Sequence, residues 1–185
     1  MPMSDRYTRT AILFHWLVAI GVITNVALAW IWPLVADEKV RPMIDLHKSV
    51  GVTVLGLAIM RLLWRLSHKP PAMPMSYKSW EVRTSHVVHW ALYFVIFAMP
   101  LTGWIMDSAW KDAATHPMPY FGLFQWPRIG FIMNLPPDTK EQMHSLFGDA
   151  HEWIAKLVYV LFVLHVAGAL KHQLEGHKEL QRMLP

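Results

Sequence analysis

The chain has 185 residues, of which 54% are hydrophobic and only 16% are charged. An ordinary soluble domain has about 25% charged residues, so this composition argues against a soluble globular protein. The chain contains no cysteine, which excludes disulfides, Cys-ligated zinc, iron–sulfur clusters and covalently attached c-type haem. The net charge is +4, and its distribution along the chain is more informative than its sum.

Four apolar segments predict membrane-spanning helices, because each can supply the roughly 20 residues that cross a bilayer. In chain order they cover residues 11–36, 47–66, 86–108 and 149–170. The apolar stretch of the first is too long for a cleavable signal peptide, which has an apolar region of about 7–15 residues. We therefore expect an all-α, four-helix transmembrane bundle, with residues 1–185 forming a single membrane-embedded domain.

The basic residues predict the orientation of this bundle. Most of the seventeen Lys and Arg residues lie near the two termini and around the connection 67–83, whereas the other two connections carry more acidic than basic residues. Basic connections stay in the cytoplasm, so both termini are expected there. The basic patches are thus topology signals, and nucleic acid is not an expected partner. The proline- and aromatic-rich connection 109–146 is expected to form an ordered cap on the outer surface.

This topology assigns a depth to each histidine of the apolar spans. The expected cytoplasmic level holds His15, His86, His89 and His165, and the expected outer level holds His47 and His151. The two histidines of the fourth span are fourteen residues apart, which corresponds to about 21 Å and almost four complete helical turns. Both imidazoles therefore lie on one helix face, at two levels of the bundle interior.

Paired imidazoles from facing helices suit a bis-histidine haem b, since the porphyrin fills apolar space and the ring nitrogens ligate its iron. At the outer level the partner of His151 is His47. At the cytoplasmic level depth alone leaves His15, His86 and His89 open as partners of His165. A histidine that only makes an interhelical hydrogen bond is the plainer alternative. A metal or proton pathway is another, although few carboxylates accompany these histidines.

Several segments resemble the bacterial cytochrome b561 family, which is related to the cytochrome b subunits of Ni-hydrogenase and formate dehydrogenase. They are "FHWLVAIGVI", "RPMIDLHKSVGVTVL", "RLLWRLSHKPPAMP", "SHVVHWALYFVIFAMPLTGWIM" and "HEWIAKLVYVLFVLHVAGALKH". The resemblance covers nearly the whole chain except the middle of the third connection. It implies two b-type haems, with iron bound by His15 and His165 at the cytoplasmic level and by His47 and His151 at the outer level.

The resemblance also implies a function and a location. We expect an oxidoreductase, or a simple electron carrier, that is a multi-pass protein of the bacterial inner membrane. It would pass electrons between the quinone pool, with ubiquinone as substrate, and a periplasmic donor that is a small molecule or a redox protein. Some similar proteins are described as oxidising superoxide, so a superoxide:ubiquinone oxidoreductase is the expected activity. The alternatives are an anchor subunit that takes electrons from a periplasmic hydrogenase-like enzyme, and a non-redox membrane transporter.

Two further residues are candidates for the cofactor site. Arg61 lies fourteen residues after His47 and so shares its helix face one level deeper. It is expected to pair with the propionates of the cytoplasmic-level haem, although an interfacial anchor is a close alternative. His89 is expected to hydrogen-bond a propionate or to relay protons to a quinone, and a packing role is equally consistent with the sequence.

Overall fold

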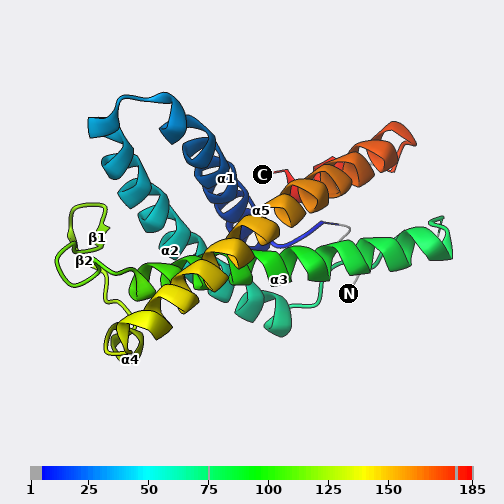
Figure 1. The fold of residues 1–185 in the computed structure, drawn as a ribbon. Helices are drawn as coiled ribbons and strands as arrows, with labels where there is room; N and C mark the ends of the chain where they lie inside the picture. Colours follow the sequence, from blue (N-terminus) through cyan, green and yellow to red (C-terminus); the bar gives the residue numbers. More distant parts are fainter. Residues whose placement is uncertain (1–5, 75, 178, 185) are drawn as a thin grey trace.

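The computed structural model describes residues 6–74, 76–177 and 179–184, and it is predominantly helical. Four long helices form a splayed bundle, and a short hairpin and two short helices join or follow them (Figure 1). The elements are α1 (Arg9–Ile31), η1 (Trp32–Leu34), α2 (Asp37–Ser67), α3 (Ser79–Ala109), β1 (Pro119–Tyr120), β2 (Phe124–Gln125), α4 (Gly130–Met133), α5 (Pro137–Leu174) and α6 (Glu179–Met183).

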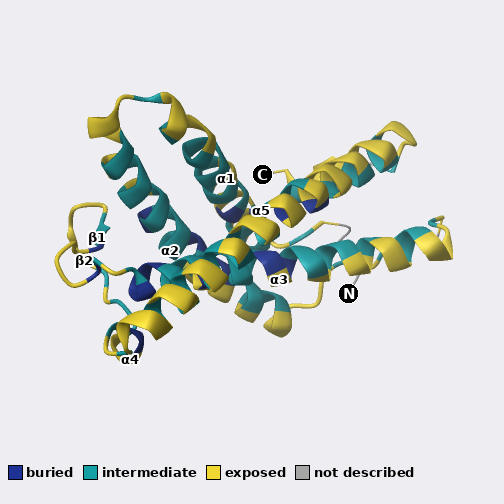
Figure 2. Cartoon of the chain, viewed as in Figure 1, coloured by how far each residue is buried: buried dark blue, intermediate teal, exposed yellow. Residues whose placement is uncertain are grey.

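The four long helices are long and apolar enough to cross a membrane, as the sequence predicts. Only 11% to 17% of their most apolar windows is buried within the protein, so most of this apolar surface needs another cover. Large side chains such as Leu63, Phe94 and Val163 are more than half exposed. Figure 2 shows the exposed residues along the outer sides of the helices. A lipid environment accounts for this surface, and the predicted four-span, all-α bundle is confirmed.

α2, α3 and α5 are longer than their predicted apolar spans, whereas α1 ends at Ile31, inside the predicted span 11–36, because helix ends follow capping signals as well as hydropathy. α2 begins at Asp37. The acidic side chains of Asp37 and Glu38 lie in its first turn and stabilise the helix, because this turn is at the positive end of the helix dipole. α5 begins with Pro137 at its first position, where the missing N–H costs nothing, followed by Asp138. Both helices therefore extend beyond the bilayer on the same side of the bundle.

The helices associate as two pairs, α1 with α2 and α3 with α5, and α2 packs on α3 to join the pairs. A cluster of Val95, Val158 and Leu161 is buried between α3 and α5. In the other pair the backbones approach closely at Gly21. A Cβ added there would lie 2.5 Å from Cγ2 of Val54, so only glycine fits without a shift. Small residues permit this kind of close helix packing in membranes.

One end of the bundle, which we call the hairpin end, is capped by residues 110–136. The backbone N–H of Phe121 donates to the hydroxyl of Ser49 on α2 at 3.0 Å, and the hydroxyls of Thr53 and Tyr120 lie 3.0 Å apart. On α3, the indole of Trp104 donates to the carbonyl of Pro127 at 2.9 Å. The predicted ordered cap over the bundle is thus confirmed, and it is anchored to both α2 and α3.

A buried ion-pair network also fastens this cap. Asp107 near the end of α3 accepts from Lys48 of α2 at 2.5 Å and from Nε of Arg128 at 2.8 Å. The side chains of Asp107 and Arg128 are only 6% and 5% exposed, and that of Lys48 is 16% exposed. Arg128 donates further to the carbonyls of Ala113 and His116, each at 2.6 Å. One carboxylate thus connects α2, α3 and the cap.

The opposite end, which we call the terminal end, brings the two ends of the chain together. The N–H of Tyr7 donates to the carbonyl of Arg182 at 3.3 Å, and the indole of Trp16 donates to the carbonyl of Met183 at 2.7 Å. Tyr77, between α2 and α3, donates its hydroxyl to Glu179 of α6 at 2.6 Å. Burial and this hydrogen bond raise the pKa of Tyr77, so its phenol stays protonated and remains a donor.

Candidate functional site

Two pairs of imidazoles face each other inside the bundle. His47 of α2 and His151 of α5 lie toward the hairpin end, with ring centroids 6.3 Å apart and planes at 68°. His15 of α1 and His165 of α5 lie toward the terminal end, with centroids 6.1 Å apart and planes at 58°. Because α5 is continuous from Pro137 to Leu174, its helical repeat places one histidine in each pair. The structure therefore brings together the four histidines in the pairs that the sequence resemblance implies.

Hydrogen bonds fix the orientation of both histidines at the hairpin end. Nδ1 of His47 lies 3.1 Å from the carbonyl oxygen of Asn25, which can only accept, so Nδ1 carries the proton. Nδ1 of His151 lies 3.0 Å from the hydroxyl of Thr102, which already donates to the carbonyls of Ala98 and Met99. The hydroxyl therefore accepts from His151, and in both rings the lone pair is left at Nε2. This is the tautomer of a metal-binding histidine that is held by its other nitrogen.

The backbone of α3 also leaves room for His151. A Cβ added at Gly103 would lie 3.3 Å from Cε1 and 3.5 Å from Nδ1 of this ring. A larger residue at position 103 would thus press on the imidazole and shift it along α3. Gly103 and Thr102 together set the position of His151 from the neighbouring helix.

The terminal-end pair is accompanied by Arg61 and His89. Nη2 of Arg61 donates to Nδ1 of His15 at 3.2 Å, and its guanidinium lies 5.1 Å from the centre of the Tyr93 ring. The ring of His89 lies 5.4 Å from that of His165, closer than His15 does, and at 66° to it. The two extra residues predicted at this level therefore do lie beside the pair.

The donor set and the spacing fit a bis-histidine haem. A metal–imidazole bond is about 2 Å long, and the ligating nitrogen lies about 1.1 Å from the centre of its ring. Two imidazoles on opposite sides of one iron therefore have ring centroids about 6.2 Å apart. The observed separations of 6.3 and 6.1 Å match this value. Among the described residues, the backbones of α1 and α2 do not approach α5 as α3 does, although their histidines reach toward it. Imidazoles that meet between separated helices suit a planar macrocycle between them.

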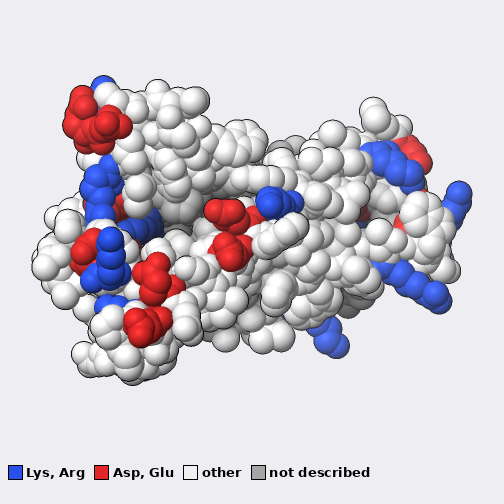
Figure 3. Space-filling view, viewed as in Figure 1, with Lys and Arg blue, Asp and Glu red and all other residues white. Residues whose placement is uncertain are grey.

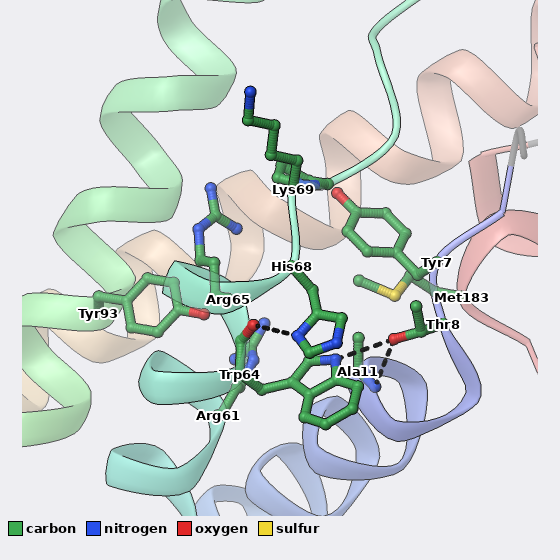
Figure 4. A pocket seen from close by; sticks show the side chains of 11 residues that line it. Tyr7, Thr8, Ala11, Arg61, Trp64, Arg65, His68, Lys69, Tyr93 and Met183 are labelled. Atoms are coloured by element: carbon green, nitrogen blue, oxygen red, sulfur yellow. Dashed lines mark hydrogen bonds between the residues drawn. The ribbon is translucent and has the colours of Figure 1, made fainter. Parts of the chain in front are cut away.

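Next to Arg61, a pocket opens at the terminal end (Figure 4). Its walls come from α1, α2, α3 and the C-terminal segment and are mainly aromatic and basic: Tyr7, Arg61, Trp64, Arg65, Tyr93 and Met183. Trp64 donates its indole N–H to Thr8 at 3.0 Å, and its ring stacks on that of His68 with centroids 3.8 Å apart. Since Arg61 both lines this pocket and contacts His15, the pocket adjoins the terminal-end imidazoles.

Four helices long and apolar enough to span a membrane, with opposed imidazoles between them, define a membrane-embedded helical bundle with interior histidine pairs as the class of this protein. Comparison with known proteins identifies the family within this class. The family described as prokaryotic cytochrome b561 matches residues 6–185, and the chain belongs to this family. Its members carry b-type haem and transfer electrons across membranes, so this chain is a multi-pass membrane cytochrome of electron transport.

Curated relatives agree over their full length. Cytochrome b561 homolog 2 of Escherichia coli K12 is 32% identical over 184 residues, which cover 97% of this chain and 92% of the relative. Cytochrome b561 homolog 1 of the same organism is 24% identical, with 98% of both chains covered. A probable superoxide oxidase, CybB, of Yersinia pestis is 26% identical over 99% of this chain and 98% of the relative.

Several residues that shape the site were not found from the sequence. The carbonyl of Asn25 gives no sequence signal, because every residue has one. Thr102 and Gly103 are adjacent in an apolar span, and a hydroxyl in that setting could have marked a partner for His151. The Asp107–Arg128 pair joins α3 to a connection whose path hydropathy does not define.

Proposed function

We propose that the protein holds two b-type haems, one ligated by His47 and His151 and the other by His15 and His165. The support is the diaxial spacing of both pairs and, at the hairpin end, the free Nε2 of each ring. When bound, the haems supply one-electron chemistry at two levels of the bundle. His47 and His151 would also exclude water from the iron and keep their orientation through Asn25 and Thr102.

His89 is the competitor of His15 for the terminal-end iron, and spacing favours His15. The His89–His165 separation of 5.4 Å is shorter than the roughly 6.2 Å that two axial imidazoles require. We assign His89 to proton delivery or to a propionate, because two protons accompany the reduction of a quinone and an imidazole can bind and pass on a proton.

Arg61 is proposed to bind haem propionates. A neutral His15 that gives the Nε2 lone pair to iron carries its proton at Nδ1, and Nδ1 can then no longer accept from Arg61. The contact of 3.2 Å would therefore be released on haem binding, which frees the guanidinium for a carboxylate. Tyr93 would keep the guanidinium in place from its other side.

The proposed reaction is the oxidation of superoxide at the hairpin end and the reduction of ubiquinone at the terminal end. Two superoxide anions would give two electrons and two molecules of dioxygen, and the quinone would take the electrons with two protons to form quinol. The named activity of the Yersinia pestis relative supports the donor, and the pocket beside Arg61, which adjoins the His15–His165 pair, marks the end at which we place quinone reduction.

The hairpin end is proposed to face the periplasm, with both termini in the cytoplasm and the chain in the bacterial inner membrane. Figure 3 shows acidic and basic side chains mixed at the hairpin end and mainly basic ones at the opposite end. Cytoplasmic ends of membrane helices are enriched in Lys and Arg, which supports this orientation.

The test is electron transfer by the purified haem-loaded chain in liposomes that contain ubiquinone. Superoxide generated outside the liposomes is expected to reduce the haems and then to form quinol, and added superoxide dismutase should abolish both. A chain that is reduced only when a periplasmic hydrogenase-like subunit is added would favour the anchor alternative. A chain without haem absorbance would favour the transporter and contradict the proposal.

A substitution at Thr102 tests the proposed role of its hydroxyl. In Thr102→Val, Nδ1 of His151 loses its acceptor, so the imidazole becomes a weaker ligand and its orientation is less restricted. We expect the reduction potential of one haem to rise by tens of millivolts and that of the other to stay unchanged, because hydrogen bonds to axial ligands tune haem potentials. Spectroelectrochemical titration measures both, and Thr53→Val, which removes a hydroxyl nearer the cap, is the control. Equal potentials in all three proteins would contradict the role.

A further inference from the structure

Outside the haem site, the end of α5 gathers two histidines and a glutamate around one point. Nδ1 of His172 lies 3.3 Å from Oε2 of Glu175, and Nδ1 of His177 lies 3.9 Å from the same oxygen. The three donor atoms are all within 4.8 Å of one another. We refer to these residues as the His172–Glu175–His177 cluster. It lies at the terminal end, beyond the apolar part of the helix.

The sequence builds this cluster through the way in which α5 ends. Gly176 has a φ of +88°, a left-handed conformation that favours glycine. The N–H of His177 donates to the carbonyl of His172 at 2.9 Å, and that of Gly176 donates to Gln173 at 3.2 Å. These are the two bonds of a Schellman motif, in which the residue after the glycine meets the last turn of the helix. That contact is commonly apolar, but here it joins two imidazoles with centroids 5.6 Å apart.

Among the residues that the structure describes, the two facing nitrogens have no hydrogen-bond partner. Nδ1 of His172 and Nδ1 of His177 are both buried, and both are unsatisfied even though Glu175 is within ion-pair distance. Buried polar atoms are nearly always satisfied in proteins, so two such atoms aimed at one carboxylate call for a ligand. The side chains of His172 and His177 are only 15% and 26% exposed, whereas that of Glu175 is 46% exposed. A small cation can therefore enter from the side of Glu175.

The surroundings hold both rings in place. Nε2 of His177 lies 3.1 Å from the hydroxyl of Ser76, which is the kind of contact that orients a metal-binding histidine through its second nitrogen. The ring of Tyr77 stacks on His172 with centroids 4.1 Å apart and meets His177 edge-on at 4.8 Å. The rings are thus fixed from the connection between α2 and α3, with their Nδ1 atoms turned toward Glu175.

We propose that the His172–Glu175–His177 cluster binds a divalent transition-metal cation, with Zn²⁺ as the best fit. Two imidazole nitrogens and one carboxylate suit zinc, and metal–ligand bonds of about 2.0–2.1 Å in a tetrahedron separate the donor atoms by about 3.3 Å. Of the three separations between donor atoms, that of His172 from Glu175 already has this value. The His177–Glu175 separation of 3.9 Å and the His172–His177 separation, which is at most 4.8 Å, would have to shorten through a rotation of His177. The remaining coordination position would be open to water on the exposed side.

Within the part of the chain that the structure describes, Lys171 is the cation that would compete with a bound metal for Glu175. Its Nζ lies 3.3 Å from Oε1 of Glu175, and it also forms an ion pair with Glu81 of α3. Lys171 can therefore keep Glu81 as its partner while Glu175 turns toward the metal. Glu81 would then be paired with Lys171, and Glu175 with the metal. Lys171 therefore lowers the affinity of the cluster for a cation but does not prevent binding.

The metal would fasten the C-terminal segment to the bundle. His177 is the first residue after the glycine turn, and α6 follows it and contacts α1 and the connection before α3 through Met183 and Glu179. Since Met183 also lines the pocket beside Arg61, a fixed C-terminal segment would keep one wall of that pocket in place. This inference concerns binding alone and does not depend on the proposed electron donor or acceptor.

The test is zinc binding by the full-length, haem-loaded chain, purified with an affinity tag that contains no histidine and stripped with a chelator. Calorimetric titration with zinc chloride is expected to show one site per chain, and His177→Ala and Glu175→Gln should each raise its dissociation constant about tenfold or more. His116→Ala, which removes an exposed histidine from the cap, is the control and should bind like the parent chain. Haem content and thermal midpoints show whether each variant is folded.

Two further readouts separate this site from weaker surface binding. Zinc X-ray absorption is expected to show two imidazoles in the parent chain and fewer in His177→Ala. Hydrogen exchange in Glu179–Met183 should slow on zinc addition in the parent chain only. No zinc binding by the parent chain, or the same binding in His177→Ala and His116→Ala, would overturn the proposal.

Discussion

His151→Ala is expected to retain about one haem per chain, where the parent chain holds about two. The loss follows because His151 and His47 are proposed to supply the two axial bonds at the hairpin-end level, and a single remaining imidazole holds haem b weakly. His47→Ala should lose the same haem, while His15→Ala and His165→Ala should lose the other. Pyridine haemochrome analysis of the purified proteins gives the stoichiometry, and redox titration identifies the haem that remains.

His89→Ala is the informative control for the terminal-end pair, because His89 lies closer to His165 than His15 does. It should retain both haems, although quinol formation should slow if His89 delivers protons. Equal haem content in all four axial variants would refute the ligand assignment. Loss of a haem in His89→Ala together with full content in His15→Ala would assign the terminal-end iron to the other ring.

The second large effect is expected for Asp107→Ala, which leaves two buried cations without their shared carboxylate. Lys48 and Arg128 both bond Asp107, and all three side chains are largely buried. Removing one partner of a buried ion pair typically costs about 3–5 kcal/mol, because the charge left behind is poorly solvated. Arg128 loses its ion pair, whereas Lys48 keeps a longer one to Asp45 at 3.9 Å. We expect a loss of this size in the free energy of unfolding, measured by denaturant titration of the haem-loaded protein in detergent micelles.

Glu141→Ala provides the matched comparison, since it removes an exposed carboxylate at the same end of the bundle. A surface change of this kind alters stability by about 0.5 kcal/mol or less. Asp107→Asn, which keeps the shape but not the charge, should lie between the two. If Asp107→Ala is as stable as Glu141→Ala, the network does not hold the cap to α2 and α3.

The four spans and the shared face of His151 and His165 could be predicted because both depend on local pattern alone. Apolar length identifies a helix that crosses a bilayer, and the helical repeat places residues fourteen apart on one face. Depth then restricts the partners of each histidine to one end of the bundle. At the terminal end depth leaves His15, His86 and His89 open. The family resemblance implies His15, and ring spacing in the folded chain favours it over His89.

The contacts that orient the site could not be predicted, because they depend on tertiary structure. His47 bonds a backbone carbonyl, which has no residue-specific signature, and Arg128 reaches Asp107 from an irregular connection. The helix ends were also predicted too short, since α2 and α5 continue into polar sequence at Asp37 and Pro137. Hydropathy locates the part of a helix inside the bilayer, whereas the helix itself ends where its capping interactions allow.

The continuous course of α5 has a consequence for how this protein tolerates change. His151 and His165 lie on one continuous helix, so the distance between the two proposed haems would be set by the geometry of α5 and hardly by the packing of the neighbouring helices. Tunnelling rates fall steeply with distance, and this arrangement protects them from drift elsewhere in the chain. Loops can lengthen or shorten freely over generations, but one codon gained or lost between these two residues would rotate one ring away from its partner by about 100°.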